Sequence, residues 1–244
     1  MIRRNYDCLL QIKKKKKNVF EMKLEGDTSA LILPGQFVNI KIDGYFLRRP
    51  ISVCDYDEKS ITLIYKVVGK GTSIMSAMQE GAWLDILTGL GNGFNPYVGG
   101  ETPVLVGGGV GVPPMYKLAK ELIAENKKVT VVMGFNAKDE IFYEEEFRAI
   151  GAEVHVTTAD GSYGTKGFVT DVLKELDYSY VYTCGPEPML KAVYNTSNTS
   201  GQFSFEERMG CGFGVCMGCS CKTKYGNKRI CADGPVLEKE EIIW

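Results

Sequence analysis

Five of the eight cysteines in this chain of 244 residues lie close together near its carboxyl-terminal end. Four residues separate Cys211 from Cys216, two separate Cys216 from Cys219, and Cys231 follows farther on. This spacing, with a distant fourth cysteine, is typical of plant-type [2Fe–2S] sites, in which four thiolates bind one cluster. The glycines between the cysteines let the backbone turn around the sulfides and direct N–H groups at them. The sequence therefore predicts a [2Fe–2S] cluster on these four thiolates.

Two alternatives concern the same cysteines. A zinc ribbon usually pairs two C-x₂-C knuckles at a longer separation, whereas this segment holds a single knuckle, at Cys216 and Cys219. Cys221 is a fifth cysteine that could replace a neighbouring ligand. No apolar export signal opens the chain, so we expect a cytoplasmic protein whose reduced thiols bind metal rather than form disulfides.

Two motifs in the first part of the chain are suited to a flavin nucleotide. An arginine pair at 48–49 begins a predicted strand, where a guanidinium can pair with a pyrophosphate and the backbone can face a flat ring. A Gly-x-Gly at 69–71 precedes a short helix predicted over 73–78, whose first N–H groups attract anions. Each motif alone is more often a surface charge or a turn. The candidate residues are Arg49, Pro50, Ile51, Ser52, Gly71 and Thr72.

A glycine-rich loop at 107–115 links a predicted buried strand to a predicted helix, which is where a dinucleotide pyrophosphate binds in an α/β sheet. It departs from G-x-G-x-x-G because Pro114 stands in place of the third glycine, and proline is compatible with a helix start. Residues 184–189 follow the last strand of the same predicted sheet, so we expect them at the same edge, near a nicotinamide ring. The candidate residues are Gly108, Gly109, Gly111, Cys184 and Gly185.

Three regions with different patterns must position these residues. Residues 1–98 form short alternating segments broken by turns, which favours a small antiparallel barrel. Residues 99–200 alternate buried strands with helices, which predicts a parallel sheet with right-handed crossovers. Residues 201–244 have too few apolar side chains for a core of their own, so another interaction must hold this segment in place. We expect three domains with these bounds.

The composition argues against several classes of protein. A net charge of −1 gives no basic surface for nucleic acid, and no stretch approaches the ~18 apolar residues that a membrane span needs. The only histidine, His155, lies in an alternating strand and is interpreted as structural, so no Ser-His-Asp or Cys-His hydrolase site can be assembled. The lysine run at 13–17 is interpreted as a solvated hairpin turn or sheet edge.

Taken in order, these motifs resemble the ferredoxin–NADP reductase superfamily over nearly the whole chain. Within it they are similar to the electron-transfer subunits of type B dihydroorotate dehydrogenases, which also carry a segment like residues 160–164. The resemblance implies a multidomain α+β fold: an antiparallel six-stranded FAD-binding β-barrel, a Rossmann-like α/β NAD domain and a small C-terminal [2Fe–2S] domain. It also implies that FAD is held by residues 49–52, by Gly71 and Thr72, and by Tyr65, Lys66 and Val67.

The resemblance further implies a role in pyrimidine biosynthesis. Electrons from dihydroorotate, oxidised at FMN in a separate catalytic subunit, would pass through the [2Fe–2S] cluster and FAD to NAD⁺, in a heterotetramer with two copies of each subunit. The choice between NAD and NADP depends on the loop at 134–140. Asp139 and Glu140 favour NAD(H), whereas Lys138 leaves NADP(H) open.

Two rival functions share some of these motifs. A related FAD and [2Fe–2S] oxidoreductase subunit that uses NAD(P)H and serves ferredoxin or sulfur chemistry differs only in its partner. A zinc-stabilised, nucleotide-sensing module without turnover belongs to another class. Purified protein of that class would lack the visible absorption of a flavin and a cluster.

Overall fold

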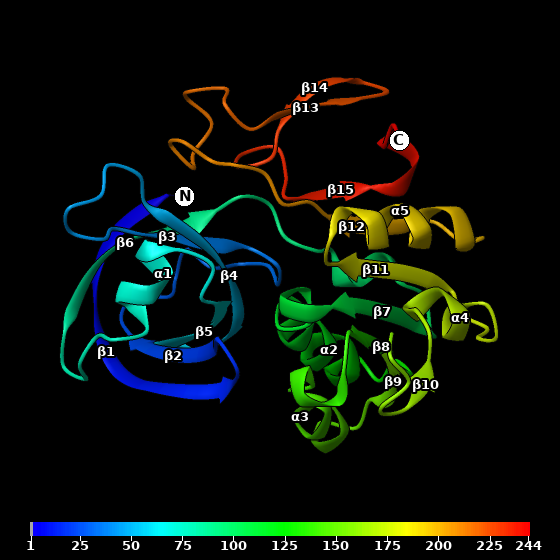
Figure 1. Ribbon diagram of the computed structural model, residues 1–244. Coiled ribbons are helices and arrows are strands. Elements are labelled where there is room, and N and C mark those ends of the chain that lie inside the picture. Colours follow the sequence, from blue (N-terminus) through cyan, green and yellow to red (C-terminus); the bar gives the residue numbers. More distant parts are fainter. Residues whose placement is uncertain (1) are drawn as a thin grey trace.

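The computed structural model describes residues 2–244. It contains a barrel, drawn blue to cyan in Figure 1, and a larger sheet with helices, drawn green to yellow. A carboxyl-terminal segment, orange to red, passes over the barrel and then along the sheet. No helix in the described part of the chain is long and apolar enough to cross a membrane.

Six antiparallel strands close the barrel in the order β1-β2-β5-β4-β3-β6, which confirms the predicted six-stranded architecture. Apolar side chains that alternate along the strands fill its interior, among them Leu24, Leu63 and Ile86. The strands are β1 (Arg3–Lys16), β2 (Val19–Glu25), β3 (Phe37–Ile40), β4 (Arg49–Tyr56), β5 (Ser60–Lys66) and β6 (Trp83–Leu90).

Two details of the barrel differ from the sequence-based expectation. The helix α1 (Lys70–Met75) begins three residues earlier than predicted, so Gly71 and Thr72 lie in its first turn. The Thr72 hydroxyl explains this start, because it accepts the N–H groups of Val68 and Gly69 at 3.1 and 3.3 Å. The lysine run does end in a hairpin, and Lys13, Lys14 and Lys17 are exposed, but Lys15 is partly buried: its ammonium lies 3.0 Å from Glu146 of the second region.

The second region is a sheet with the order β10-β9-β8-β7-β11-β12-β15, in which the pairs from β10 to β12 are parallel. Helices separate most of its strands along the chain, as the alternation of patterns predicts, although none lies between β9 and β10 or between β12 and β15. The strands are β7 (Pro103–Gly108), β8 (Thr130–Phe135), β9 (Glu153–Thr158), β10 (Thr165–Lys166), β11 (Tyr180–Cys184), β12 (Gly201–Ser204) and β15 (Val236–Glu238). The helices are α2 (Pro114–Ala124), α3 (Glu144–Ala149), α4 (Val169–Leu173) and α5 (Glu187–Thr196). The 3₁₀ turns are η1 (Pro96–Val98), η2 (Gly109–Gly111), η3 (Lys138–Glu140) and η4 (Lys239–Glu241).

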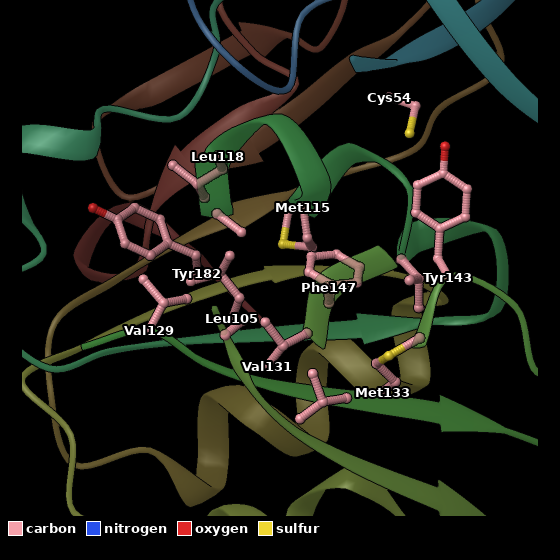
Figure 2. Packing of buried hydrophobic residues seen from close by; sticks show 14 of the residues in the cluster. Cys54, Leu105, Met115, Leu118, Val129, Val131, Met133, Tyr143, Phe147 and Tyr182 are labelled. Atoms are coloured by element: carbon pink, nitrogen blue, oxygen red, sulfur yellow. The ribbon is translucent and has the colours of Figure 1, made fainter. Parts of the chain in front are cut away.

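Apolar side chains hold α2 against this sheet. Met115 and Leu118 of α2 are fully buried together with Leu105 of β7 and Val131 of β8. Figure 2 shows these side chains between the helix and the strands, with Tyr182 on one side and Phe147 on the other. The helix therefore sits firmly on the strand ends that carry the glycine-rich loop.

The carboxyl-terminal segment is stapled to both other regions. Its hairpin, β13 (Ser220–Thr223) and β14 (Gly226–Arg229), stands apart, whereas β15 pairs antiparallel with β12. Asn92, which follows the barrel, donates from Nδ2 to the carbonyls of Asp233 and Val236 and accepts the Val236 N–H. The strands β12 and β15 lie after residue 200, yet they complete the sheet of the second region. A domain boundary at residue 200 therefore stays a prediction.

A test of the core uses α2. Leu118→Ala should lower the free energy of unfolding by about 2–5 kcal/mol, because it leaves a cavity at a fully buried site. Leu118→Met, which keeps the volume, should cost less than about 1.5 kcal/mol. Urea unfolding followed by circular dichroism measures both, and equal losses would contradict the packing described.

Candidate functional site

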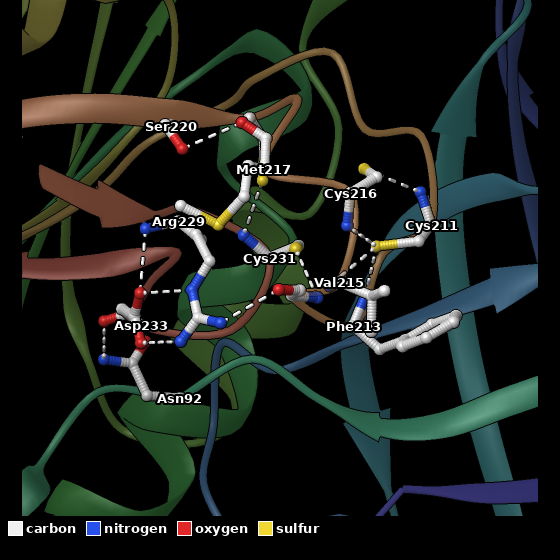
Figure 3. Close-up of polar contacts among 12 residues, drawn as sticks. Asn92, Cys211, Phe213, Val215, Cys216, Met217, Ser220, Arg229, Cys231 and Asp233 are labelled. Atoms are coloured by element: carbon white, nitrogen blue, oxygen red, sulfur yellow. Dashed lines mark hydrogen bonds and ion pairs between the residues drawn. The ribbon is translucent and has the colours of Figure 1, made fainter.

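The four cysteines of the predicted cluster site lie in and beside one loop, and Figure 3 labels three of them, Cys211, Cys216 and Cys231. Backbone N–H groups of this loop point at their sulfurs. The N–H groups of Phe213, Val215 and Cys216 donate to Cys211 Sγ at 3.5, 3.3 and 3.5 Å, and that of Gly214 donates to Cys231 Sγ at 3.1 Å. Such donors stabilise thiolates and tune the potential of an iron–sulfur cluster.

These hydrogen bonds change the acidity of Cys211. Partial burial raises the pKa of its thiol, but the three N–H donors outweigh this effect and lower the pKa to about 6. The thiolate is the form that binds metal, so the loop prepares Cys211 as a ligand. Burial and the neighbouring Cys219 thiol instead raise the pKa of Cys231 to about 12. Cys231 therefore needs a bound metal to lose its proton near neutral pH.

The cysteines form two pairs. Cys211 and Cys216 make one, through the Cys211 N–H to Cys216 Sγ at 3.5 Å, and Cys219 and Cys231 make the other, through the Cys231 N–H to Cys219 Sγ at 3.4 Å. Within residues 2–244, no three His, Cys, Asp or Glu side chains meet as a site for a single metal ion. A [2Fe–2S] cluster has two irons, and two thiolates for each iron are what two cysteine pairs supply.

The contacts favour Cys231 over Cys221 as the fourth ligand. Cys231 is buried and accepts the N–H of Gly214, in the middle of the loop. Cys221 lies in β13, where it pairs with Lys228 in the hairpin, and burial raises the pKa of its thiol. The choice of Cys231 as the fourth ligand stays a prediction.

Two side chains far from the cysteine motif hold the loop. Arg229 donates from Nη1 to the Gly214 carbonyl at 2.9 Å and is itself paired with Asp233. Asn39 of β3 donates from Nδ2 to the Cys211 carbonyl at 3.4 Å. Gly212 has a φ of +79°, and a Cβ there would lie 2.3 Å from Asn39 Nδ2, so only glycine fits. No sequence motif marked these clamps, because each joins residues distant in the chain or of common type.

The structure brings the two predicted flavin motifs together. Arg49, at the start of β4, reaches α1 so closely that a Cβ on Gly71 would lie 2.2 Å from Arg49 Nε. The Tyr45 ring stacks against the Arg49 guanidinium, with 4.9 Å between the ring centroid and the guanidinium carbon. A guanidinium beside bare backbone N–H groups suits a pyrophosphate. The other residues of the motif, Pro50, Ile51 and Ser52, pair along β3 with Asn39, Val38 and Phe37.

The remaining predicted flavin residues lie on the neighbouring strand. β5 runs antiparallel to β4, so Tyr65 and Lys66 at its end lie beside the start of β4, and Val67 follows. The Tyr65 hydroxyl is buried and has no hydrogen-bond partner among the described residues, which leaves it free for a bound group. Thr72 is different, because its hydroxyl is engaged by the turn before α1. In the structure this hydroxyl shapes the loop, and the binding of FAD by Thr72 stays a prediction.

The two predicted nucleotide segments also meet. Cys184 at the end of β11 pairs with Gly107 at the end of β7, so both segments leave the same edge of the sheet. A Cβ on Gly111 would lie 2.3 Å from the Cys184 carbonyl oxygen and 2.6 Å from Gly185 Cα. Gly108 is covered by Met189 and Pro186, which the sequence argument had not selected as contacts. Gly109 has a φ of +52° in η2, and nothing lies over it.

The loop at 134–140, on which the choice between NAD and NADP depends, packs against residues 160–164. The Lys138 N–H donates to Ser162 Oγ at 2.8 Å, and its ammonium lies 5.6 Å from the centroid of the Tyr163 ring. Glu140 accepts a hydrogen bond from the Asn136 side chain at 2.9 Å. His155, interpreted as structural, is 2.9 Å from Glu153 on β9 and away from these sites in the register of the sheet.

Comparisons with known proteins bear on the same regions. A family described as the iron–sulfur cluster binding domain of dihydroorotate dehydrogenase B matches residues 206–243, and an oxidoreductase NAD-binding domain matches residues 105–195. The dihydroorotate dehydrogenase B (NAD(+)) electron transfer subunit of Fusobacterium nucleatum is 46% identical, over 93% of each chain. That of Lysinibacillus sphaericus is 44% identical, over 99% of each chain. The chain belongs to the family of dihydroorotate dehydrogenase B electron transfer subunits.

The fold of the family is shared with solved structures. An NADH-dependent reduced ferredoxin–NADP oxidoreductase, described for flavin-based electron bifurcation, superposes with a TM-score of 0.87. The two are 31% identical, and the match covers 98% of this chain and 90% of the other. The predicted membership of the family and the predicted three-part fold are thereby confirmed.

The contact between Arg49 and Gly71 can be tested with two alanine variants. Gly71→Ala should displace the Arg49 guanidinium and weaken FAD binding by about tenfold, the loss of one charge-assisted contact. Gly69→Ala is the matched control, since nothing lies within 4 Å of a Cβ there. Titration of FAD into the deflavinated protein measures both affinities. Equal effects of the two changes would argue against the site.

The cysteine assignment is tested by serine variants. Cys216→Ser should abolish the EPR signal of the reduced cluster while FAD content and NADH-to-dye activity remain, because the flavin and nucleotide residues lie on other strands. Cys221→Ser should keep the signal. Loss of the signal in Cys221→Ser, with retention in a Cys231→Ser variant, would reverse the choice of fourth ligand.

Proposed function

We propose that this chain carries electrons from dihydroorotate, oxidised in a partner subunit that contains FMN, through a [2Fe–2S] cluster and FAD to NAD⁺. Asn39 provides the observation that most supports this order. Its side chain contacts the carbonyl of Cys211, and its backbone pairs with Pro50 of the predicted flavin motif. One buried residue thus joins the predicted cluster ligands to the predicted FAD strand.

The residues of the chain have separate tasks in this function. Bound FAD supplies the exchange between electron pairs and single electrons. Arg49 and the start of α1 would hold its pyrophosphate, and the N–H groups around Cys211 would favour the reduced cluster by offsetting its negative charge. Gly109, over which nothing lies, would admit the dinucleotide phosphates close to the backbone, while Gly108 and Gly111 would shape the same binding loop by packing against Met189 and Cys184.

The cluster loop has a surface suited to a protein partner. Cys216 is exposed, and around it Val215 is 73% exposed, with Phe213 and Met217 also open to solvent. Apolar side chains beside a redox centre are typical of a docking site at which water is excluded. Relatives are named electron transfer subunits, which implies a catalytic partner. We propose that the catalytic FMN subunit docks here, and that two copies of each subunit assemble.

A second candidate is a subunit that exchanges electrons with ferredoxin. The likeness to the reduced ferredoxin–NADP oxidoreductase over 98% of this chain supports it. The relatives named for dihydroorotate dehydrogenase B are more similar in sequence, at 46% against 31% identity. The preferred cofactor is NAD(H), because Asp139 and Glu140 lie in the turn that follows β8 and the Lys138 ammonium rests on Tyr163.

The function is tested by isolating the chain with its partner from the native host. The co-purifying subunit should contain FMN, and the complex should reduce NAD⁺ with dihydroorotate. A complex that ignores dihydroorotate but exchanges electrons between ferredoxin and NAD(P)H would establish the second candidate instead. A colourless protein with bound zinc would exclude both.

The docking surface has a test of its own. Val215→Asp should weaken the complex by at least about tenfold, because it places a charge in a dehydrated apolar contact, while the EPR signal of the cluster stays. Tyr225→Asp is the matched control, since Tyr225 is equally exposed but lies at the turn of the β13–β14 hairpin. Pull-down with the catalytic subunit measures the difference. Full binding by Val215→Asp would place the partner elsewhere.

A further inference from the structure

Two lysines of α2 cross from the sheet region to the barrel. Lys120 Nζ lies 2.8 and 3.1 Å from the two carboxylate oxygens of Asp55, near the end of β4. Lys117 Nζ donates to the Tyr56 carbonyl at 3.2 Å and lies 4.4 Å from the centroid of the Tyr56 ring. Residues three apart on a helix share one face. One face of α2 is therefore bound to one end of β4.

Both elements carry predicted cofactor residues at their other ends. β4 begins with Arg49 and the flavin motif, and α2 begins directly after the glycine-rich loop. That loop cannot slide alone, because Gly111 is packed against the Cys184 backbone with no room for a Cβ. A movement of α2 relative to β4 would therefore move both nucleotide segments relative to the flavin strand.

A second set of contacts lies beside the first, at the junction between the barrel and the sheet region. Cys54 of β4 is fully buried and faces Tyr143, as Figure 2 shows. The Tyr143 hydroxyl donates to Glu21 of β2 at 3.3 Å, and Lys15 of β1 lies between Glu21 and Glu146, at 3.5 and 3.0 Å. Tyr143 has a φ of +69°, a conformation that a bulky residue adopts only where its surroundings impose it. The junction is thus built from specific contacts.

We propose that Lys117 and Lys120 are positioning residues, which fix α2 and its nucleotide loop at the spacing from β4 that places the nicotinamide against the flavin. This rests on the proposed function. The Asp55 and Lys120 side chains are 24% and 39% exposed, and such ion pairs contribute little to the free energy of unfolding. Transfer between two cofactors depends steeply on their alignment, since an error of about 1 Å can cost about 100-fold in rate. The lysines should therefore affect the rate more than the stability.

The test follows the half-reaction in which NADH and a proton reduce FAD to FADH₂ and leave NAD⁺. The full chain with its cofactors is mixed anaerobically with NADH, and the flavin absorbance is recorded over a range of NADH concentrations. Lys120→Met should lower the limiting rate by about tenfold with little change in apparent NADH affinity or melting temperature. Asp55→Asn combined with Lys120→Met should be no slower than the single variants, because all remove one contact.

Lys127→Met is the matched control. Lys127 follows the same helix but donates to the Gly100 carbonyl at 2.9 Å, on its own side of the junction, so its variant should reduce FAD at the wild-type rate. A wild-type limiting rate in Lys120→Met overturns the proposal. So does an equal loss of rate in Lys127→Met.

Hydrogen exchange separates this inference from the proposed function. Amides of β4 and of the first turns of α2 should lose protection in Lys120→Met and keep it in Lys127→Met, whether or not a cofactor is bound. Unchanged protection in Lys120→Met would refute the positioning contact. A protein that binds no FAD would instead refute the proposed function, while the exchange result still decides whether the lysines join the two regions.

Discussion

A loop rich in cysteine and glycine can surround an iron–sulfur cluster only if other parts of the chain hold it, because its apolar side chains, Phe213, Val215 and Met217, are exposed and build no core. In this protein the holding groups come from the first region, residues 1–98, and from the carboxyl-terminal segment itself. Asn39 of the barrel binds the Cys211 carbonyl, Arg229 of the hairpin binds the Gly214 carbonyl, and Asn92 fixes the chain after Asp233. The backbone N–H groups are thereby directed at the sulfurs rather than at water, which is the condition for stable thiolate ligands.

The same constraint explains the unequal cysteines. Cys211 lies near the surface, where several N–H donors lower the pKa of its thiol, whereas Cys231 is buried beside another thiol, which raises its pKa. A cluster between the pairs would have one iron near solvent and the other against the core. The exposed side, with Val215 and Cys216, is the side from which a partner can reach it. Burial on the other side limits access of water and oxidants.

Close backbone approach recurs at the other predicted sites. Gly71 gives room to the Arg49 guanidinium, and Gly111 gives room to the Cys184 backbone. In both places a side chain would occupy the space that brings two distant segments together. The relative placement of these segments then depends on how the barrel and the sheet meet, through Lys117 and Lys120 of α2 and through Tyr143. Apolar packing holds α2 on the sheet and reaches Val19, Cys54 and Ile64 of the barrel, and directional contacts add the orientation between the two.

The sequence alone determined the features that depend on near neighbours. Cysteine spacing predicted the cluster loop, alternation predicted the barrel strands, and glycines at strand ends predicted the nucleotide segments, because all of these are local patterns. Only the tertiary structure decided that Arg49 meets Gly71, that Asn39 meets Cys211 and that β15 joins the sheet beside β12. It also turned Lys15, expected in solvent, into a contact between regions. These pairings join residues of common types that are far apart in the chain, and nothing in their local pattern distinguishes them before the fold brings them together.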